Sequence, residues 1–172
     1  MGMNDARISE VRGESELDIA RSLFEEYARE IDVDLCFQGF ADELANLSSM
    51  YAPPGGGILL AHGDDGVLGC VGFRRLAPDT CEMKRLYVRP AARGSHLGRR
   101  LVLEIIDRAR AAGYERMVLD TLPRMKAARS LYRSLGFEEV SPYYDNPTEG
   151  VLYMELPLRE GFWVPAPHGS IP

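Results

Sequence analysis

Apolar side chains recur every three or four positions in the middle of the chain, a spacing typical of an amphipathic helix. The apolar stripe comprises Leu97, Leu101, Val102, Ile105, Ile106, Ala109 and Ala112. Gly113 follows the last periodic position, where a helix end favours a left-handed residue. Ser95 stands at the expected N-cap. The pattern therefore predicts a helix over residues 97–112.

Three further stretches carry the same helical spacing of apolar residues. They cover residues 15–30, residues 41–50, and a segment that starts at Pro123 and ends at Gly136. Proline suits the first turn of a helix because its missing N–H is not needed there, and glycine suits the residue after the last turn. We therefore expect about four helices.

Short apolar or alternating runs predict strands between these helices. The runs cover residues 6–12, 58–62, 67–75, 80–88, 116–121, 137–140 and 151–157. The fourth run changes parity between Met83 and Leu86, which predicts a β-bulge near Arg85. The central helix joins this run to the next one, and a crossover of that length implies that the two strands pair in parallel.

The start of the central helix carries an unexpected charge pattern. Arg93, Arg99 and Arg100 lie at or near this end, although the N-terminus of a helix is itself partly positive and favours acidic residues. A bound anion would remove the conflict, because the free N–H groups of a helix start after a glycine-bearing turn readily bind phosphate. The alternative is that these arginines are solvated surface residues, and the pattern alone does not decide between the two.

The charge of the whole chain narrows the partners that the protein can have. The net charge is −6 and the isoelectric point is near 5.1, which argues against sustained binding of nucleic acid because that needs a basic face. An acidic body with one basic loop suits a small anionic cofactor and a cationic co-substrate.

Cysteines and histidines give no sign of a metal site. The three cysteines are widely spaced in apolar surroundings and the three histidines have no ligand spacing, so neither a disulfide framework nor a zinc site is expected. No run of 18 apolar residues occurs, and the N-terminus lacks the apolar region of a signal peptide. We expect a cytoplasmic protein without a metal or a membrane partner.

The order of these elements resembles the GNAT superfamily of N-acetyltransferases. The family's pyrophosphate motif, Gln/Arg-x-x-Gly-x-Gly/Ala, falls on residues 93–98, and the sequence Leu-Tyr-x-x-Leu-Gly-Phe follows at residues 131–137. Two positions depart from the family pattern. His96 stands where the motif's first glycine is usual, and Met125 stands where many members have an asparagine that contacts the cofactor.

The resemblance implies an α/β (α+β) fold and a domain organisation. The fold would be a mixed, mostly antiparallel sheet of six to seven strands with a central parallel pair that splays apart, flanked by about four helices. A single acetyltransferase domain would cover residues 1–158, followed by a Pro-rich tail at residues 159–172. Many family members dimerise through sheet edges, so a homodimer is a further expectation.

The resemblance also implies a cofactor, acetyl-CoA, whose pyrophosphate would be held by backbone amides at the start of the central helix. The pantetheine arm would pair with the bulged strand like an added strand. The residues that match the family's cofactor positions are Leu86, Val88, Arg93, Gly94, Ser95, His96, Leu97, Gly98, Arg99, Arg100 and Ala128.

The reaction implied is direct attack of an amine on the thioester in a ternary complex. Tyr132 matches the family's tyrosine general acid, and Glu82 matches the general-base glutamate of its histone acetyltransferases. Tyr132 could instead be a core residue, and Glu82 could pair with Lys84 or Arg85 while water carries the proton. A non-catalytic sensor that binds acyl-CoA is the alternative function.

The acceptor is expected to be an amine of a small metabolite, an amino acid or a protein. The family builds its acceptor pocket from the first helical region and the loop between the last two strands, and acids and aromatic rings there suit a cation. The candidate residues are Phe24, Tyr27, Phe37, Gln38, Tyr143, Tyr144 and Asp145, with Asp32, Asp34 and Asn146 in the same segments.

Overall fold

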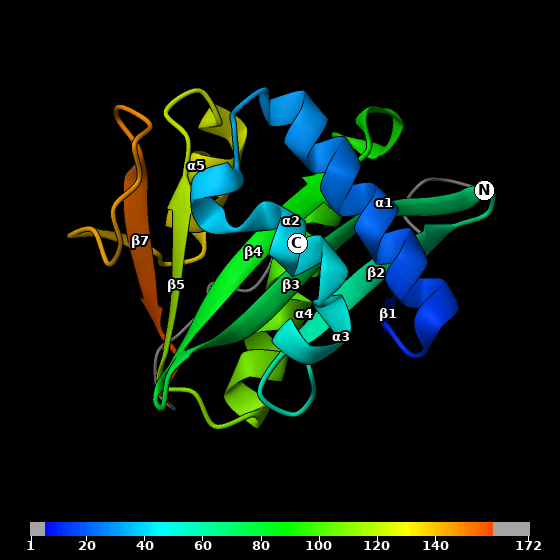
Figure 1. Cartoon of the computed structure of the whole chain (residues 1–172), viewed down its shortest axis with the longest axis horizontal. Coiled ribbons are helices and arrows are strands. Elements are labelled where there is room, and N and C mark those ends of the chain that lie inside the picture. Colours follow the sequence, from blue (N-terminus) through cyan, green and yellow to red (C-terminus); the bar gives the residue numbers. More distant parts are fainter. Residues whose placement is uncertain (1–5, 160–172) are drawn as a thin grey trace, which may run out of the picture.

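A computed structural model describes residues 6–159, which form a seven-stranded sheet with helices on both faces (Figure 1). The strands are β1 (Arg7–Glu10), β2 (Gly57–Gly63), β3 (Gly66–Ala77), β4 (Thr80–Val88), β5 (Arg116–Thr121), β6 (Glu138–Val140) and β7 (Leu152–Pro157). Their order in the sheet is β1-β2-β3-β4-β5-β7-β6. The predicted Pro-rich tail lies outside the described residues, except for Arg159.

The pairing confirms the fold that the sequence implies. Strands β4 and β5 are parallel, and every other neighbouring pair is antiparallel. The helices are α1 (Glu14–Ile31), α2 (Phe40–Ala45), α3 (Leu47–Met50), α4 (Leu97–Ala111) and α5 (Lys126–Ser134), with 3-10 turns η2 (Cys36–Gln38) and η3 (Pro90–Ala92). Among the described residues, no helix is both long and apolar enough to cross a membrane.

Two helix predictions need correction. The helix expected over residues 41–50 is two short helices. The backbone of Asn46 leaves helical geometry between the two helices, and the Asn46 side chain donates a hydrogen bond of 2.9 Å to the Asp42 carbonyl. The last helix begins at Lys126 rather than at Pro123. The Pro123 carbonyl instead accepts a hydrogen bond of 2.9 Å from the Arg129 guanidinium, which closes a turn before the helix.

The two parallel strands pair over a short distance and then separate. Their register runs only from Thr80 opposite Arg116 to Glu82 opposite Val118, and Figure 1 shows β4 and β5 diverging beyond that point. The predicted bulge is confirmed, because the register of β3 against β4 shifts between Lys84 and Tyr87. Within the shift, Arg85 has φ 59°, a left-handed conformation that bends the strand.

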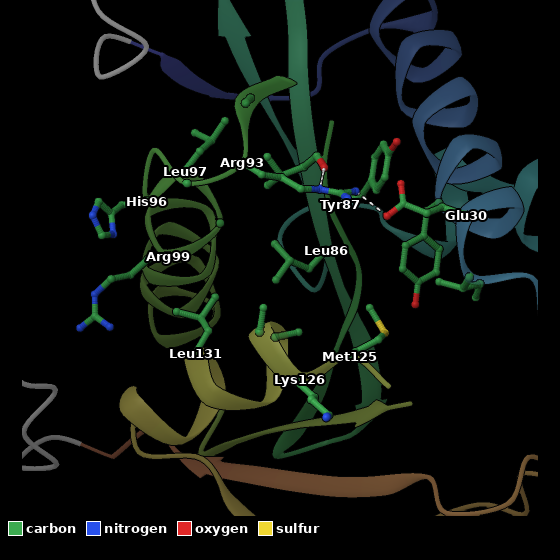
Figure 2. A pocket seen from close by; sticks show the side chains of 18 of the residues that line it. Glu30, Leu86, Tyr87, Arg93, His96, Leu97, Arg99, Met125, Lys126 and Leu131 are labelled. Carbon is green, nitrogen blue, oxygen red and sulfur yellow. Dashed lines mark hydrogen bonds and ion pairs between the residues drawn. The ribbon is translucent and has the colours of Figure 1, made fainter. Parts of the chain in front are cut away.

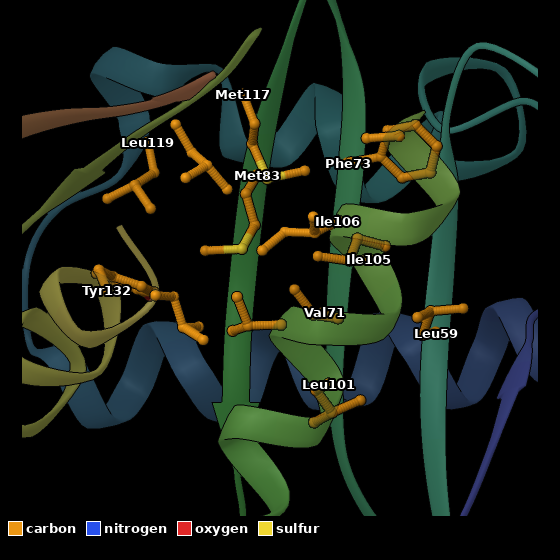
Figure 3. Packing of buried hydrophobic residues seen from close by; sticks show 14 of the residues in the cluster. Leu59, Val71, Phe73, Met83, Leu101, Ile105, Ile106, Met117, Leu119 and Tyr132 are labelled. Atoms are coloured by element: carbon orange, nitrogen blue, oxygen red, sulfur yellow. The ribbon is translucent and has the colours of Figure 1, made fainter. Parts of the chain in front are cut away.

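Alternate side chains of the strands pack into two hydrophobic cores on opposite faces of the sheet. On one face, α4 places Leu101, Ile105 and Ile106 against Val71 and Met83 (Figure 3). Each such buried side chain contributes about 1.5–3 kcal/mol to folding. This packing fixes α4, and therefore its N-terminus, relative to β4.

The second core lies under α1 and α3. Leu23 and Phe24 of α1 pack on Ile58 and Leu60 of β2, and all four are almost completely buried. Phe24 was predicted to line the acceptor pocket, and its burial corrects that prediction because no part of its side chain is left for a ligand to contact.

Candidate active site

A cleft of about 760 Å³ opens between α1, the bulged half of β4, the loop before α4 and the start of α5 (Figure 2). Most of the residues predicted to bind the cofactor line this cleft. They are Leu86, Val88, Arg93, Gly94, His96, Leu97, Gly98, Arg99 and Ala128. Ser95 and Arg100 of the same prediction lie beside the cleft without lining it.

The loop before α4 reaches the helix through two left-handed residues, Gly94 at φ 82° and His96 at φ 60°. His96 is the N-cap residue, which corrects the prediction for Ser95. The Ser95 hydroxyl donates a hydrogen bond of 2.6 Å to the Ala92 carbonyl and so closes the preceding turn. Figure 2 shows the His96 ring pointing away from the side of the loop that faces Leu86.

The N-terminus of α4 has no side-chain cap and no acid in its first turn. Its first helical hydrogen bond runs from the Arg100 N–H to the His96 carbonyl. The N–H groups before Arg100 therefore have no partner within the helix, and they share the partial positive charge of a helix start. This end of the cleft is suited to an anion.

The arginines at this end are held by specific contacts rather than being free surface residues. Arg93 lies across the cleft from α4, where it contacts the Val88 carbonyl at 2.9 Å and the Glu30 carboxylate at 2.5 Å. Arg99 donates to the Ser134 hydroxyl at 3.0 Å, and Arg100 donates to the Ala6 carbonyl at 2.6 Å.

Two further cations on the cleft wall, Arg124 and Lys126, escaped the sequence analysis. They flank Met125, the position at which the sequence departs from the family's asparagine. Arg124 lies in the turn between β5 and α5 and Lys126 is the first residue of α5, whereas Pro123 suggested that the whole segment was helical.

The bulge of β4 is fixed from the face opposite α4. Arg85 forms a buried ion pair with Glu43 of α2, with contacts of 2.6 and 3.1 Å, and the Tyr51 hydroxyl donates to the same carboxylate at 2.6 Å. Burial favours the neutral acid, but the hydrogen bonds and charge of Arg85 outweigh it and lower the pKa of Glu43. The Arg85 guanidinium also lies 5.0 Å from the centre of the Phe40 ring.

Glu82 is buried within the sheet and both of its oxygens are occupied. One oxygen contacts Arg74 at 3.0 Å and lies 3.9 Å from Lys84, and the other accepts a hydrogen bond of 2.7 Å from the Tyr143 hydroxyl. Of the two ion-pair partners proposed from the sequence, Lys84 is therefore at the edge of contact, while Arg85 is engaged by Glu43.

Tyr132 lies in the core on the α4 side of the sheet, with its ring 5.7 Å from that of Phe137. It is 5% exposed and does not line the cleft. Burial raises the pKa of its hydroxyl, with the nearby Tyr27 and Asp120 adding to the shift, so the hydroxyl stays protonated at neutral pH.

A second, small cavity adjoins the cleft and shares Tyr27 and Ile31 with it. It is lined by residues from the two segments expected to form the acceptor pocket and from the end of β5. These residues are Tyr27, Ile31, Val33, Leu35, Phe37, Gln38, Asp120, Thr121, Leu122, Asn146 and Thr148. Of the residues predicted to bind the acceptor, Tyr27, Phe37 and Gln38 line this cavity, whereas Asp145 is exposed and does not.

A chain of hydrogen bonds joins the walls of this cavity. Gln38 donates to the Tyr144 hydroxyl at 3.1 Å, and that hydroxyl donates to Asp120 at 2.8 Å. Tyr143 packs against Tyr144 and Tyr153. The sequence analysis missed Asp120 because it is the only acid in an otherwise buried strand and was read as part of that strand.

Comparison with known proteins identifies the family. Residues 18–137 match the model of the Acetyltransferase (GNAT) family. The chain belongs to this family. Together with the names of its relatives, the membership makes the protein an acyltransferase of the GNAT type.

Relatives and solved structures agree with the GNAT assignment. An uncharacterized N-acetyltransferase of Schizosaccharomyces pombe is 46% identical over 162 residues, which cover 93% of this chain and 99% of the relative. An IAA acetyltransferase of Azospirillum brasilense is 37% identical over 123 residues, covering 69% and 78% of the two chains. A putative acetyltransferase of Salmonella typhimurium, solved with its cofactor acetyl-CoA, shares the GNAT fold with a TM-score of 0.69 at 22% identity, over 94% of this chain and 98% of that one.

Proposed function

We propose that this protein transfers an acetyl group from acetyl-CoA to an amine by direct attack within a ternary complex. The observation that carries the proposal is the cleft itself. One end is the uncapped N-terminus of α4, and the other is the gap where β4 leaves β5. The Salmonella structure of the same fold contains acetyl-CoA, which supports this choice of acyl donor.

The residues present suit the proposed donor. Gly94 has no Cβ and no atom within 4 Å of the place where a Cβ would stand, so its backbone is open to a close approach by phosphate. Arg99, Arg124 and Lys126 add positive charge along the cleft. Beyond the bulge, the edge of β4 that faces away from β3 no longer pairs with β5, which leaves it open to the amide groups of a pantetheine arm.

Bound acetyl-CoA would supply an activated acetyl thioester, and two protein groups are proposed to manage the protons. Tyr132 would donate its hydroxyl proton to the sulfur that leaves as the C–S bond breaks. Glu82 would receive the proton that the amine loses. The Tyr143 hydroxyl already donates a hydrogen bond to one Glu82 oxygen. The amine would therefore pass its proton to the Tyr143 oxygen while Tyr143 passes its own hydroxyl proton to Glu82.

The first test is calorimetric titration of the protein with acetyl-CoA, followed by detection of free thiol across a panel of amines. We expect saturable binding and release of thiol with at least one amine. Binding without turnover on any amine would instead favour an acyl-CoA sensor, and absence of binding would contradict the assignment of the cleft.

A charge reversal tests the phosphate end separately. Arg99→Glu should weaken binding of acetyl-CoA by about tenfold or more, since a hydrogen bond to a charged group is worth roughly 1.5–3 kcal/mol. Arg110→Glu makes the same charge change at the far end of α4 and should leave the affinity nearly unchanged. Equal effects of the two variants would show that only net charge matters.

A further inference from the structure

Three acids lie along the region where β4 and β5 diverge, and they differ in how their charge is compensated. Glu43 is paired with Arg85, and Glu82 is paired with Arg74. Within residues 6–159, Asp120 has no cationic nitrogen inside 4.0 Å. Its hydrogen-bond partners are neutral groups, the Tyr144 hydroxyl at 2.8 Å and the Asn146 amide at 3.4 Å. Asp120 is therefore the acid of the three whose charge is left for a ligand.

The charge of Asp120 is felt throughout the surrounding cluster of tyrosines. After burial, it contributes to raising the pKa of Tyr132, Tyr143, Tyr144 and Tyr153. These hydroxyls stay protonated, so they can donate hydrogen bonds to the Asp120 carboxylate but cannot neutralise its charge. A positively charged ligand would neutralise it.

The cavity beside Asp120 has the size of a single small polar group. Its volume is about 20 Å³, and a cavity of roughly 10–15 Å³ already holds one water molecule. An ammonium group is of similar size.

The rest of the lining restricts what can accompany the ammonium group. The wall combines the apolar side chains of Ile31, Val33, Leu35, Phe37 and Leu122 with neutral polar groups and Asp120, and within the described residues no lysine, arginine or histidine lines it. A carboxylate next to the amine would have no cation to pair with, and burying it unpaired is strongly unfavourable.

Lys84 does not change this conclusion, although it is close in the sequence to the bulge. Its ammonium group is 3.1 Å from the Gln38 side-chain oxygen, and it is 6% exposed and lies off the cavity wall. The Lys84 charge interacts with Asp120 from a distance, but a carboxylate confined to the cavity meets the Gln38 side chain at the wall and not the Lys84 ammonium group.

We propose that Asp120 receives the ammonium group of the acceptor and that the acceptor is an amine with no carboxylate on the carbon that bears it. This inference rests on the proposed acetyltransferase function and deepens it. It selects simple alkyl and arylalkyl amines, or amines of larger molecules, over free α-amino acids. Asp120 acts as a binding residue. The ammonium group must release one proton to solvent in the cleft before the neutral amine attacks, and the second proton, lost as the C–N bond forms, passes through Tyr143 to Glu82 as described above.

Matched pairs of acceptors test the proposal on the wild-type protein. 2-Phenylethylamine is compared with phenylalanine, and isobutylamine with valine, at saturating acetyl-CoA with thiol release as the readout. Each amine should exceed its amino acid in kcat/KM by about tenfold or more, because an unpaired buried charge costs at least as much as one charge-assisted hydrogen bond. Equal or better use of the amino acids would overturn the proposal.

A pair of variants tests the role of Asp120. Asp120→Asn should raise KM for the amines by about tenfold or more and change kcat less, with unchanged calorimetric affinity for acetyl-CoA as evidence of an intact fold. Glu149→Gln removes one negative charge from the loop between β6 and β7, away from the cavity, and should leave KM unchanged. An unchanged KM in Asp120→Asn, or an equal rise in both variants, would contradict the proposal.

The experiment separates this inference from the proposed function. If the protein binds acetyl-CoA but acetylates only acceptors that carry the carboxylate, or none of the four compounds, the inference about Asp120 is wrong and the donor site stands. If acetyl-CoA itself does not bind, the proposed function fails first.

Discussion

His96 is the residue at which this chain departs most clearly from the family motif, and its backbone explains how the departure is tolerated. It adopts φ 60°, the conformation for which the motif's glycine is suited. A side chain in this region costs about 1–2 kcal/mol, but the His96 side chain is exposed and so is not confined by the core. The loop therefore keeps its shape at a local cost in strain.

Two variants at the left-handed positions test this account, one that introduces glycine and one that removes it. His96→Gly should raise the free energy of unfolding by about 1 kcal/mol or less, because relief of strain is partly offset by the greater entropy of glycine in the unfolded chain. Gly94→Ala should lower it by about 1 kcal/mol, since Gly94 has φ 82° and would become the strained residue. Urea unfolding measures both. A large loss of stability in His96→Gly would mean that the imidazole makes a stabilising contact.

Tyr132 allows a second prediction for a single side chain. Its hydroxyl stays protonated because its pKa is raised by burial, so Tyr132→Phe should reduce kcat by about 10²-fold or more if the hydroxyl is the acid. The melting temperature should change little, because the ring keeps its packing against Phe137. A kcat within error of the wild-type value would return Tyr132 to a purely structural role in the core.

Sequence reasoning placed the cleft residues better than the proton-transfer residues. A change of parity along one strand predicted the bulge, and the resemblance to GNAT enzymes then pointed to Leu86 and Val88, which line the cleft. The engagement of Glu82 by Arg74 could not be predicted, because these residues meet through the register of β3 against β4. Asp120 escaped notice for a related reason, since its importance depends on which residues are absent around it.

Strand β4 is the element on which the site depends, and its bulge is held by the ion pair between Arg85 and Glu43. Strands β4 and β5 matched their predicted limits because both are mostly buried runs between clear turn signals. The pair itself could not be read from the sequence, because α2 reaches β4 only through tertiary packing. It links the bulge to the segment that carries Phe37 and Gln38.

Removing one partner of this pair should be strongly destabilising. Arg85→Met leaves the Glu43 carboxylate buried without its cation and should lower the free energy of unfolding by about 3–5 kcal/mol. Adding Glu43→Leu in the same chain should recover part of the loss, because the unpaired charge is then gone. Chemical denaturation of the wild type, Arg85→Met, Glu43→Leu and the double variant measures these effects. A double variant whose loss equals the sum of the two single losses would show that the two residues are not coupled.

The same pair predicts how stability responds to acid. The pKa of Glu43 is lower in the folded protein than its ordinary value of 4.5, so its contribution is present above pH 4.5 and is lost as the pH falls toward the folded pKa. The wild-type protein should lose stability over this acid range. The double variant, which has no carboxylate at position 43, should lose less.

Across the whole molecule, the cleft draws on segments that lie far apart in the chain, from α1 to α5. Its parts are held in place by packing that exists only in the folded state. Any ligand of the cleft must therefore bind the folded protein in preference to the unfolded chain, and its binding adds directly to the free energy of unfolding.

Thermal unfolding in the presence of acetyl-CoA gives the corresponding prediction. At a concentration about 100 times its Kd, the ligand should stabilise the fold by about 2.7 kcal/mol, which for a chain of this length raises Tm by roughly 5–11 °C. Arg99→Glu should show a smaller shift at the same concentration, and Arg110→Glu should match the wild-type protein. Equal shifts in all three would mean that the ligand binds elsewhere.

The divergence of β4 and β5 gives the sheet two inner edges that face each other, in addition to its outer edges on β1 and β6. An exposed edge normally invites other strands to pair with it and so favours aggregation. Here helices cover both faces of the sheet around the gap (Figure 1), and an ordinary polypeptide strand would have to fit its side chains between them. The helices therefore shield the two inner edges from pairing with strands of other molecules.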